Sequence, residues 1–273
     1  MRSRLHWLRV ATVALAAGVA IFPFYWMIRT SVAPPDETWF QGISLLPESP
    51  TMENYTAAWE EAGLLSAMAT GLIVALGILV LQLLTVIPAA YAFATVRFRG
   101  RTILFVVVLA SLLIPVQVSA VPNFLIVNEL GLLDTRLGLI LPFATSAFGI
   151  FLVRQHMLTV PASLLDAARS DGLSRLQTML RVYVPLAGPS IAAFALFSFY
   201  IHWNDYLWPL LVTRSAGLRT PPLALAIFQQ AETGFEYGKL TAGAVVVTLP
   251  VVLAFLLAQR RFVHGIAGGE VGE

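Results

Sequence analysis

Six stretches of this sequence are apolar for long enough to cross a lipid bilayer, and this feature limits the fold more than any other. A helix that crosses about 30 Å of hydrocarbon needs about 20 mainly apolar residues. The windows that meet this requirement are Val10–Ile28, Ser66–Ala94, Thr102–Val121, Gly138–Arg154, Pro189–Val212 and Leu240–Ala258. Because backbone groups in lipid must be hydrogen-bonded within the protein, we expect six transmembrane helices.

The composition excludes a soluble globular domain. Hydrophobic residues make up 58% of the 273 residues and charged residues only 12%, which is too few to cover the exterior unless lipid contacts most of it. Several windows contain proline, and the fourth contains both Pro142 and Gly149. Neighbouring helices must satisfy the backbone groups that proline frees. We therefore expect an all-α integral membrane protein with kinked helices.

The distribution of charge predicts the orientation in the membrane, because short cytoplasmic loops carry an excess of Lys and Arg. With alternating sides, one side receives twelve of the seventeen basic residues: Arg2, Arg4, Arg9, Arg97, Arg99, Arg101, Arg154, Arg169, Arg175, Arg181, Arg260 and Arg261. Residues 31–65, on the other side, include six acidic residues and no basic one. Both termini are therefore expected in the cytoplasm. The basic start resembles a signal peptide, but the first window is longer than a typical signal core, so we expect it to be retained.

This topology divides the chain into three parts. Residues 1–65 are the first transmembrane helix and an acidic extracytoplasmic segment, and residues 66–259 are a five-helix core with a cytoplasmic loop at 159–185. Residues 260–273 are a cytoplasmic tail.

Residues for covalent or metal chemistry are missing or scattered. The chain has no cysteine, its four histidines lack the spacing of metal ligands, and its single lysine, Lys239, lies in no glycine-rich phosphate-binding loop. We expect no catalytic residue, no metal site and no cofactor in this chain. Tyr237–Lys239 is expected in an outer loop, and no function is assigned to it.

The loop between the fourth and fifth windows is polar, and its first half predicts a short helix. Pro161 suits the first turn of a helix, where its missing N–H is no loss. Three apolar residues share one face of this helix: Leu164, Leu165 and Ala168. Asp171 and Gly172 then end it, since glycine takes the positive φ of a helix terminus at little cost.

The second half of this loop predicts another helix, from Ser174 to just before Pro185. Its apolar stripe consists of Leu176, Met179, Leu180 and Tyr183. The two helices would form a hairpin at the inner membrane face. On the pattern alone, an amphipathic hairpin that only links two spans at the lipid surface is an equal alternative.

A resemblance decides between these alternatives. Asp166-Ala167-Ala168 is followed after three residues by Gly172, and after nine more by Val182-Tyr183-Val184-Pro185. This pattern resembles the EAA loop (E-A-A, G, I-x-L-P) of the membrane subunits of binding-protein-dependent ABC importers, with its spacing reproduced. The sequence departs from this pattern at three positions, with Asp for Glu at 166, Val for Ile at 182 and Val for Leu at 184.

The resemblance implies a role for the hairpin, because this loop in the family is a coupling helix that docks on a separate ATP-binding subunit. The coupling residues it implies are Asp166, Ala167, Ala168, Arg169, Asp171, Gly172 and Pro185. It also implies a type I importer permease (MetI-like) fold in the bacterial cytoplasmic membrane. ATP and Mg would be bound by the partner ATPase subunits.

The partners that the resemblance implies are a second homologous permease subunit, two ATP-binding subunits and an extracytoplasmic solute-binding protein. Whether the second permease is an identical or a different chain stays open. Lipid is the other expected partner, and no nucleic acid is expected.

Two further stretches resemble carbohydrate-type permeases of the maltose and glycerol-phosphate kind. They are Tyr200–Val212, in the fifth window, and the QRRFVHGIAGGEVGE ending. The implied solute is a sugar or oligosaccharide, and a glycerol-phosphate-type importer is the alternative. An ion-coupled secondary transporter is a weaker alternative, because that class uses several intramembrane acids.

Asp205 is the one acidic residue within the windows, where it would cost about 2.5–3.5 kcal/mol if exposed to lipid. Trp203, Asn204 and Tyr206 surround it, and such aromatic and amide groups suit the stacking and hydrogen bonding of sugars. An equal alternative places Asp205 at the outer interface, with the tryptophans in the aromatic belt.

Three isolated amides complete the candidates for the substrate path. Gln117 and Asn123 are retained as candidates, together with Gln82. A single amide within a span more often bonds a neighbouring helix, so a structural role is the stronger expectation for each.

Overall fold

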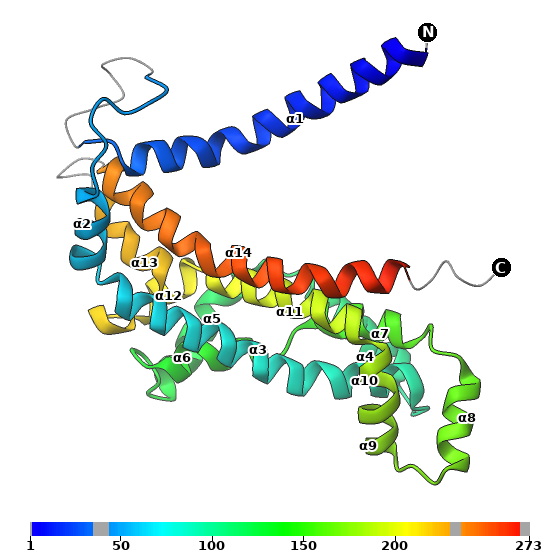
Figure 1. The fold of residues 1–273 in the computed structure, drawn as a ribbon. Helices are drawn as coiled ribbons and strands as arrows, with labels where there is room; N and C mark the ends of the chain where they lie inside the picture. The colour runs from blue at the N-terminus through cyan, green and yellow to red at the C-terminus, as the bar shows by residue number, and fades with distance from the viewer. Residues whose placement is uncertain (1, 35–43, 230–235, 268–273) are drawn as a thin grey trace. The chain divides into compact units, whose positions relative to one another are not determined.

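The computed structural model describes residues 2–34, 44–229 and 236–267, and this part of the chain contains helices and no strand (Figure 1). The chain forms two compact units. The first consists of Met1–Ser66 and Pro221–Leu249, and the second of Ala67–Thr220 and Pro250–Glu273. This division reflects packing, whereas the parts expected from the sequence follow membrane topology, so those boundaries stay predictions.

The first unit contains two long helical segments and three short helices. These are α1 (Arg2–Ser31), α2 (Glu53–Glu61), the 3-10 helix η5 (Ala226–Gln229), α13 (Pro221–Leu225) and the first part of α14 (Tyr237–Ala267).

A buried amide fastens this unit together. Asn54, at the start of α2, donates from Nδ2 to the carbonyl of Ser31 (3.1 Å), the last residue of α1, and to that of Ala33 (2.7 Å) just after it. Ser31 in turn contacts the Tyr55 hydroxyl at 2.8 Å. These bonds satisfy carbonyls at the end of α1 that have no partner within the helix.

The second unit contains the remaining elements. Its longer helices are α3 (Leu64–Thr95, from Ala67 onward), α4 (Arg101–Ser111), α5 (Val116–Glu129), α7 (Ala147–Met157), α8 (Ala162–Ser170) and α11 (Gly188–Trp203). Its short elements are α6 (Arg136–Ile140), η2 (Leu141–Phe143), α9 (Arg175–Thr178), the π-helix η3 (Met179–Tyr183), α10 (Val184–Leu186), α12 (Leu207–Val212) and η4 (Ala216–Leu218).

Three of the six expected spans are confirmed as continuous helices. Val10–Ile28 lies within α1, Ser66–Ala94 within α3 and Leu240–Ala258 within α14, and each of these helices is long and apolar enough to cross a membrane.

The other three expected spans are interrupted helices, in agreement with the expectation of kinked helices. Helix pairs meet at 99° in the third window (Arg101–Ser111 with Val116–Glu129) and at 45° in the fourth (Arg136–Phe143 with Ala147–Met157), and a bend of 78° (Arg175–Leu186 with Gly188–Trp203) lies at the start of the fifth. Pro115 provides the physical reason at the first bend, because its extended backbone (φ −60°, ψ 137°) and missing N–H cannot continue a helix. If each pair counts as one span, the described chain has six.

The fifth window differs further from expectation. Its helix α11 ends at Trp203, and α12 begins only at Leu207. Asp205 therefore lies in a helix break, where its Oδ1 accepts a hydrogen bond from the N–H of Trp208 (3.3 Å). This bond reaches the first turn of α12, whose N-cap is Tyr206.

Two apolar clusters form the core of the second unit. The larger one packs α3 against α7, η3 and α11 through Val86, Ala90, Tyr91, Ile150, Val153, Met157, Met179, Tyr183, Ala187 and Phe194. The smaller one packs α3 against α5, α6 and α12 through Val74, Ile78, Val127, Leu139, Trp208 and Val212.

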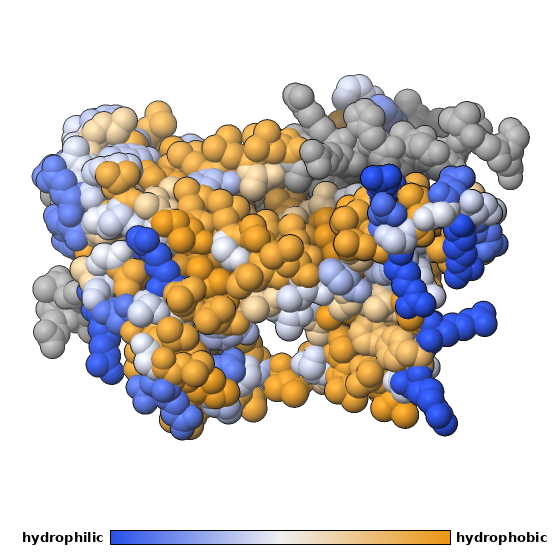
Figure 2. All heavy atoms as spheres, turned by 90° about the horizontal axis from the view of Figure 1, so that it is seen from below, coloured by the Kyte–Doolittle hydropathy of each residue, from blue (hydrophilic) through white to orange (hydrophobic). Residues whose placement is uncertain are grey.

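Much of the exterior is apolar. Figure 2 shows apolar residues over most of the face in view, with the most hydrophilic side chains toward its edges. The large exposed residues of α4, such as Ile103, are typical: its side chain is 71% exposed. A surface of this kind is stable only against lipid or another protein.

Candidate functional site

The expected hairpin is present in the second unit, and its first helix is α8. Pro161 is the N-cap of α8, one position before the first-turn placement expected from the sequence. At the other end, Gly172 adopts a φ of +73°. The N–H of Leu173 bonds the carbonyl of Ala168 and that of Gly172 bonds Arg169, both at 3.0 Å. This pair of bonds is a Schellman motif, so Gly172 ends α8 as predicted.

The second helix of the hairpin begins after Ser174, as expected. The Ser174 side chain accepts from the N–H of Gln177 (3.3 Å), and the Gln177 side chain accepts from the N–H of Ser174 (2.8 Å). This reciprocal capping box fixes the start of α9. Both turns of the hairpin therefore have their backbone groups bonded, which gives the loop a defined shape.

One face of the hairpin is anchored in the larger apolar cluster. Ala168 on α8 and Met179 on η3 are buried. The rings of Tyr183 and Tyr91, on η3 and α3, meet edge to face with 5.2 Å between their centroids. Such aromatic pairs are worth about 0.5–1.5 kcal/mol beyond burial. The expected stripe of the second helix is divided, because Leu176 and Leu180 are more than half exposed.

The rest of the hairpin surface is exposed. It carries most of the implied coupling residues: Asp166, Ala167, Arg169, Asp171 and Gly172. Asp166 and Arg169 form an ion pair of 3.3 Å whose side chains are 71% and 67% exposed. Such a pair contributes about 0–1 kcal/mol, so these charges are available to a partner. Ala168, the remaining residue of the triplet, belongs to the anchored face.

Pro185, the last implied coupling residue, is exposed on α10. It lies just before the 78° bend between the hairpin and α11. His156 on α7 bonds the carbonyl of Leu186 at 2.9 Å, which satisfies a backbone group next to the bend. The structure thus places Pro185 at the joint between the hairpin and the fifth span rather than on the exposed tip.

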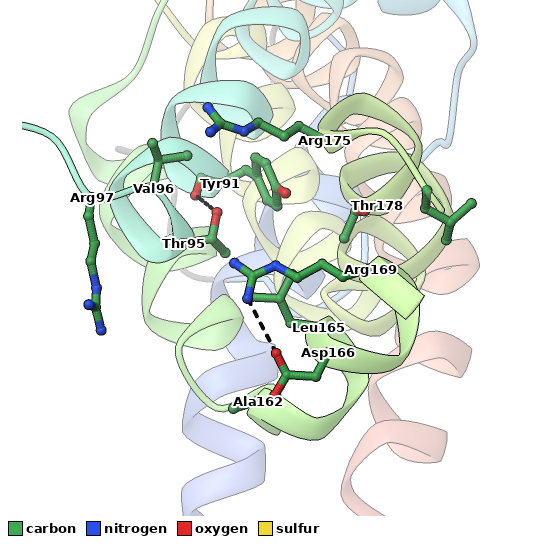
Figure 3. A pocket seen from close by; sticks show the side chains of 11 residues that line it. Tyr91, Thr95, Val96, Arg97, Ala162, Leu165, Asp166, Arg169, Arg175 and Thr178 are labelled. Carbon is green, nitrogen blue, oxygen red and sulfur yellow. Dashed lines mark hydrogen bonds and ion pairs between the residues drawn. The ribbon is translucent and has the colours of Figure 1, made fainter. Parts of the chain in front are cut away.

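A cavity of about 720 Å³ separates α8 from the end of α3 (Figure 3). From the hairpin, Asp166, Arg169 and Arg175 line it. Figure 3 shows Arg169 and Arg175 reaching toward the end of α3, where Thr95 and Arg97 lie. The hairpin is therefore anchored by its apolar face but separated from the core on its polar side.

The break between α11 and α12 brings together four candidate residues of the substrate path, with different exposures. Trp203 is buried and stacks on Phe199 with 5.6 Å between ring centroids. Asn204 and Tyr206 are exposed, and Asp205 is half-buried. In this conformation, Asn204 and Tyr206 are at the surface and Asp205 is partly accessible, whereas Trp203 is not.

The amide candidates lie on two helices. Gln117 is exposed and Asn123 half-buried on α5, and Asn123 is one turn before Val127, which packs against α12. Gln82 is buried on α3. Its Nε2 donates to the carbonyl of Phe143 (3.0 Å), and its Oε1 accepts from the hydroxyl of Ser198 (2.7 Å). Gln82 therefore has the structural role that its sequence context favoured.

The partners of Gln82 were not predicted, because they lie far from it along the chain. His202 Nε2 lies 3.2 Å from its amide nitrogen, and because an amide nitrogen only donates, His202 accepts there and is neutral. One turn along α3, Thr85 donates to the carbonyl of Ala144 (2.9 Å). Gln82 and Thr85 thus satisfy two carbonyls that the bend before α7 leaves free.

A second unpredicted group joins two loops. Asp134 has a φ of +56°, and its Oδ1 accepts from the N–H groups of Arg214 and Ser215, both at 2.9 Å. Its Oδ2 accepts from the Ser215 hydroxyl. These bonds, the hydroxyl first, hold the pKa of the Asp134 carboxyl below its ordinary value.

The ligands needed for a metal are not brought together in residues 2–34, 44–229 and 236–267. No group of three or more His, Cys, Asp or Glu side chains there could hold an ion.

Comparison with known proteins shows where this architecture occurs. Residues 86–267, which include the hairpin and both bends that flank it, match the family of binding-protein-dependent transport system inner membrane components. The chain belongs to this family. It is an inner-membrane permease subunit of an ABC transporter, and the matched region contains the EAA-like loop and the α11–α12 break.

Individual relatives align along nearly the whole chain. The arabinooligosaccharides transport system permease protein AraQ of Halalkalibacterium halodurans is 35% identical, over 98% of this chain and 96% of the relative. The lactose transport system permease protein LacG of Rhizobium radiobacter is 31% identical, over 94% and 93%. The sn-glycerol-3-phosphate transport system permease protein UgpE of Agrobacterium fabrum is 33% identical, over 96% of each.

A solved structure shares the fold of this permease. The crystal structure of a bacterial ABC transporter involved in the import of the acidic polysaccharide alginate matches with a TM-score of 0.82 and 26% identity, over 96% of this chain and 98% of that chain. The all-α importer fold that the sequence resemblance implied is thereby confirmed.

Proposed function

We propose that this permease carries a carbohydrate through the membrane by alternating access, and that an ATPase subunit moves it by holding the exposed face of α8. The observation that supports this most is the two-sided construction of the hairpin. Met179 and Tyr183 belong to the larger apolar cluster and Leu165 packs against it, whereas Asp166, Ala167 and Gly172 are exposed. A force applied to the exposed face would therefore act on the helices of the core.

The mechanism follows from differential binding. ATP would bind more tightly to one arrangement of the two ATPase subunits. ATP binding would therefore shift the permease toward the conformation that fits this arrangement. The capping box and the Schellman motif give the hairpin a fixed shape, so that it would move as a unit with η3. The bend between α10 and α11 then connects this movement to the fifth span.

The proposed complex contains two ATP-binding subunits, a second permease subunit and a solute-binding protein, with ATP and Mg bound by the ATPase subunits. The family description supports the binding protein. We place both termini and the hairpin in the cytoplasm. Two contacts agree with this topology, because each joins two segments assigned to the outer side. One is between Asp134 and Ser215, and the other is between Lys239 and Glu61.

The solute is proposed to be a sugar or an oligosaccharide. Relatives named for arabinooligosaccharide and lactose transport support this class. Between Gly188 and Val212 the sequence has no Lys or Arg, while Asp205 adds a negative charge. If this segment lines the path, it would favour a neutral solute over an anion. Glycerol phosphate is the second candidate, because relatives named for its transport are equally similar.

The coupling role is tested with a pair of glycine variants. Gly172 and Gly100 both have positive φ (+73° and +83°), and an added Cβ would meet no atom at either position. Gly172→Trp and Gly100→Trp therefore carry similar backbone strain. We expect Gly172→Trp to detach the ATPase subunits or uncouple hydrolysis from uptake, and Gly100→Trp to do so far less. Intact association and uptake in Gly172→Trp would contradict the proposal.

The solute is tested by uptake into proteoliposomes that contain the full complex and its solute-binding protein. We expect uptake of a radiolabelled arabinooligosaccharide or lactose, with no competition from glycerol 3-phosphate. Uptake of glycerol 3-phosphate alone would contradict the carbohydrate assignment and support the second candidate.

A further inference from the structure

The cavity between α8 and the end of α3 is strongly basic. Three arginines line it, namely Arg97, Arg169 and Arg175, and Asp166 is the one acidic group among the described residues that do so. The remaining lining is small or apolar, apart from the hydroxyl groups of Tyr91, Thr95 and Thr178. The cavity opens on the polar side of the hairpin, where the core leaves it unfilled (Figure 3).

Among the described residues, carboxylates do not balance the positive charge of this cavity. Asp166 pairs with Arg169 at 3.3 Å. In the described part of the chain, the guanidinium groups of Arg97 and Arg175 form no ion pair. Two guanidinium charges therefore face the cavity without a carboxylate, and each offers a planar set of donors that fits the oxygens of a phosphate group.

We propose that this cavity binds a phosphate-bearing anion, either the headgroup of an anionic lipid or a small phosphate ester. Its volume of about 720 Å³ is that of a small-molecule site. Arg97 and Arg175 bind the phosphate oxygens from opposite sides, and Arg169 adds a third positive group. The Thr95 hydroxyl already bonds the carbonyl of Tyr91 at 2.9 Å, but its oxygen can still accept a hydrogen bond from the anion.

Of these two possible anions, the surroundings of the cavity favour the lipid headgroup. Arg97 also lines a neighbouring hollow of about 400 Å³, together with Gly100, Arg101 and Thr102. This basic hollow leads to α4, whose Ile103 and Leu104 are 71% and 51% exposed. A lipid whose phosphate lies between the arginines could therefore lay its acyl chains along α4. Basic pockets at the cytoplasmic ends of transmembrane helices bind lipid headgroups in this way.

The position of the cavity gives the anion a regulatory role. Arg175 belongs to the hairpin, whereas Arg97 follows α3. An anion held by both would tie the hairpin to the core on its polar side, which the apolar anchor leaves open. We infer that the bound anion stiffens the joint between α8 and the core. This effect on coupling depends on the proposed function, but the binding itself does not.

The test uses the full complex in nanodiscs and the absence of cysteine from this chain. A single cysteine replaces Thr95, and its rate of alkylation by a maleimide is followed by mass spectrometry of this chain. Ser163→Cys, exposed on α8 but not in the cavity lining, is the control. Discs of phosphatidylcholine alone are compared with discs that contain phosphatidylglycerol, and with phosphatidylcholine discs in inorganic phosphate.

We expect an anion to slow the alkylation of position 95 about fivefold or more and to leave position 163 unchanged. Protection by phosphatidylglycerol alone identifies a lipid headgroup, and protection by inorganic phosphate identifies a free phosphate ester. Adding Arg97→Gln and Arg175→Gln should abolish the protection, whereas Arg181→Gln, outside the lining, should preserve it. Higher salt should weaken protection if the anion is bound mainly by charge.

Three results would overturn the inference. They are no protection by either anion, protection that survives loss of both arginines, and protection that depends on the ATPase subunits but on no anion. The last result would mean that carboxylates of the partner fill the cavity. Co-purification of the ATPase subunits, measured on the same samples, shows separately whether the proposed coupling role has failed.

Discussion

Gln82 on α3 donates a hydrogen bond to the backbone carbonyl of Phe143, with 3.0 Å between Nε2 and the oxygen. The bond crosses to the place where the fourth span bends by 45° before α7. A bend within a membrane frees backbone carbonyls, and water is not present there to satisfy them. The buried amide on the neighbouring helix thus makes the bend stable.

Gln82→Leu should destabilise the second unit. The substitution removes the donor to Phe143 and the acceptor for Ser198, and unsatisfied buried groups cost about 1–3 kcal/mol. Thermal unfolding of the purified complex in detergent measures the loss. Gln117→Leu, at an exposed position of α5, is the control and should change the stability little. Equal stability of the two variants would show that the network does not support the bend.

Gly149→Ala should be far more damaging than Gly77→Ala. A Cβ at Gly149 would lie 2.5 Å from the ring of Phe194, which is buried, whereas at Gly77 it would meet the mobile end of the Ile140 side chain at 2.8 Å. Overpacking against a ring that cannot move costs about 1–3 kcal/mol. Unfolding curves of both variants test this contrast, and a stable Gly149→Ala protein would contradict the packing of α7 on α11.

Gly238→Ala and Asn54→Ala should be coupled in the first unit. A Cβ at Gly238 would lie 2.6 Å from the Asn54 side chain, which is buried and holds the end of α1. The clash disappears once Asn54 is truncated. A double-mutant cycle should therefore show that the double variant is less destabilised than the sum of the single variants. Additive effects would mean that the two residues do not touch.

The loop contact of Asp134 should weaken in acid. Its folded-state pKa is lowered, so its contribution is present above the pKa of the unfolded chain and is lost as the pH falls through the folded-state pKa. Amide hydrogen exchange at Arg214 and Ser215 should therefore lose protection as the pH falls below about 4. Ser215→Ala removes the largest cause of the shift and should move this loss to higher pH. Protection that is independent of pH in both proteins would rule the contact out.

The hairpin was predictable because its signals are local. Pro161, Gly172 and the Ser174 cap each act within a few residues, and the structure shows each of them near the expected position. The long spans were predictable for the same reason, since length and apolarity suffice to identify them. The bend at Pro115 was foreseen only as a kink, because the angle depends on the helices packed around it.

Contacts between distant segments were not predictable. Tyr237–Lys239 was expected in a loop, but it forms the first turn of α14, and Lys239 contacts both carboxylate oxygens of Glu61 at 2.9 Å. Nothing in either segment alone indicates this pairing. In the same way, the composition around Asp205 suggested a residue within a span. The helix break and the hydrogen bond from the Trp208 N–H depend on backbone geometry that composition does not show.

Site-specific cross-linking from α8 tests the central claim most directly. A photo-reactive amino acid replaces Ala167, on the exposed face of α8, and separately Leu104, which is 51% exposed on the apolar α4. In membranes that contain the full complex, we predict that position 167 cross-links to the ATPase subunit and position 104 does not. Cross-links from position 167 to lipid or to no protein would contradict the account.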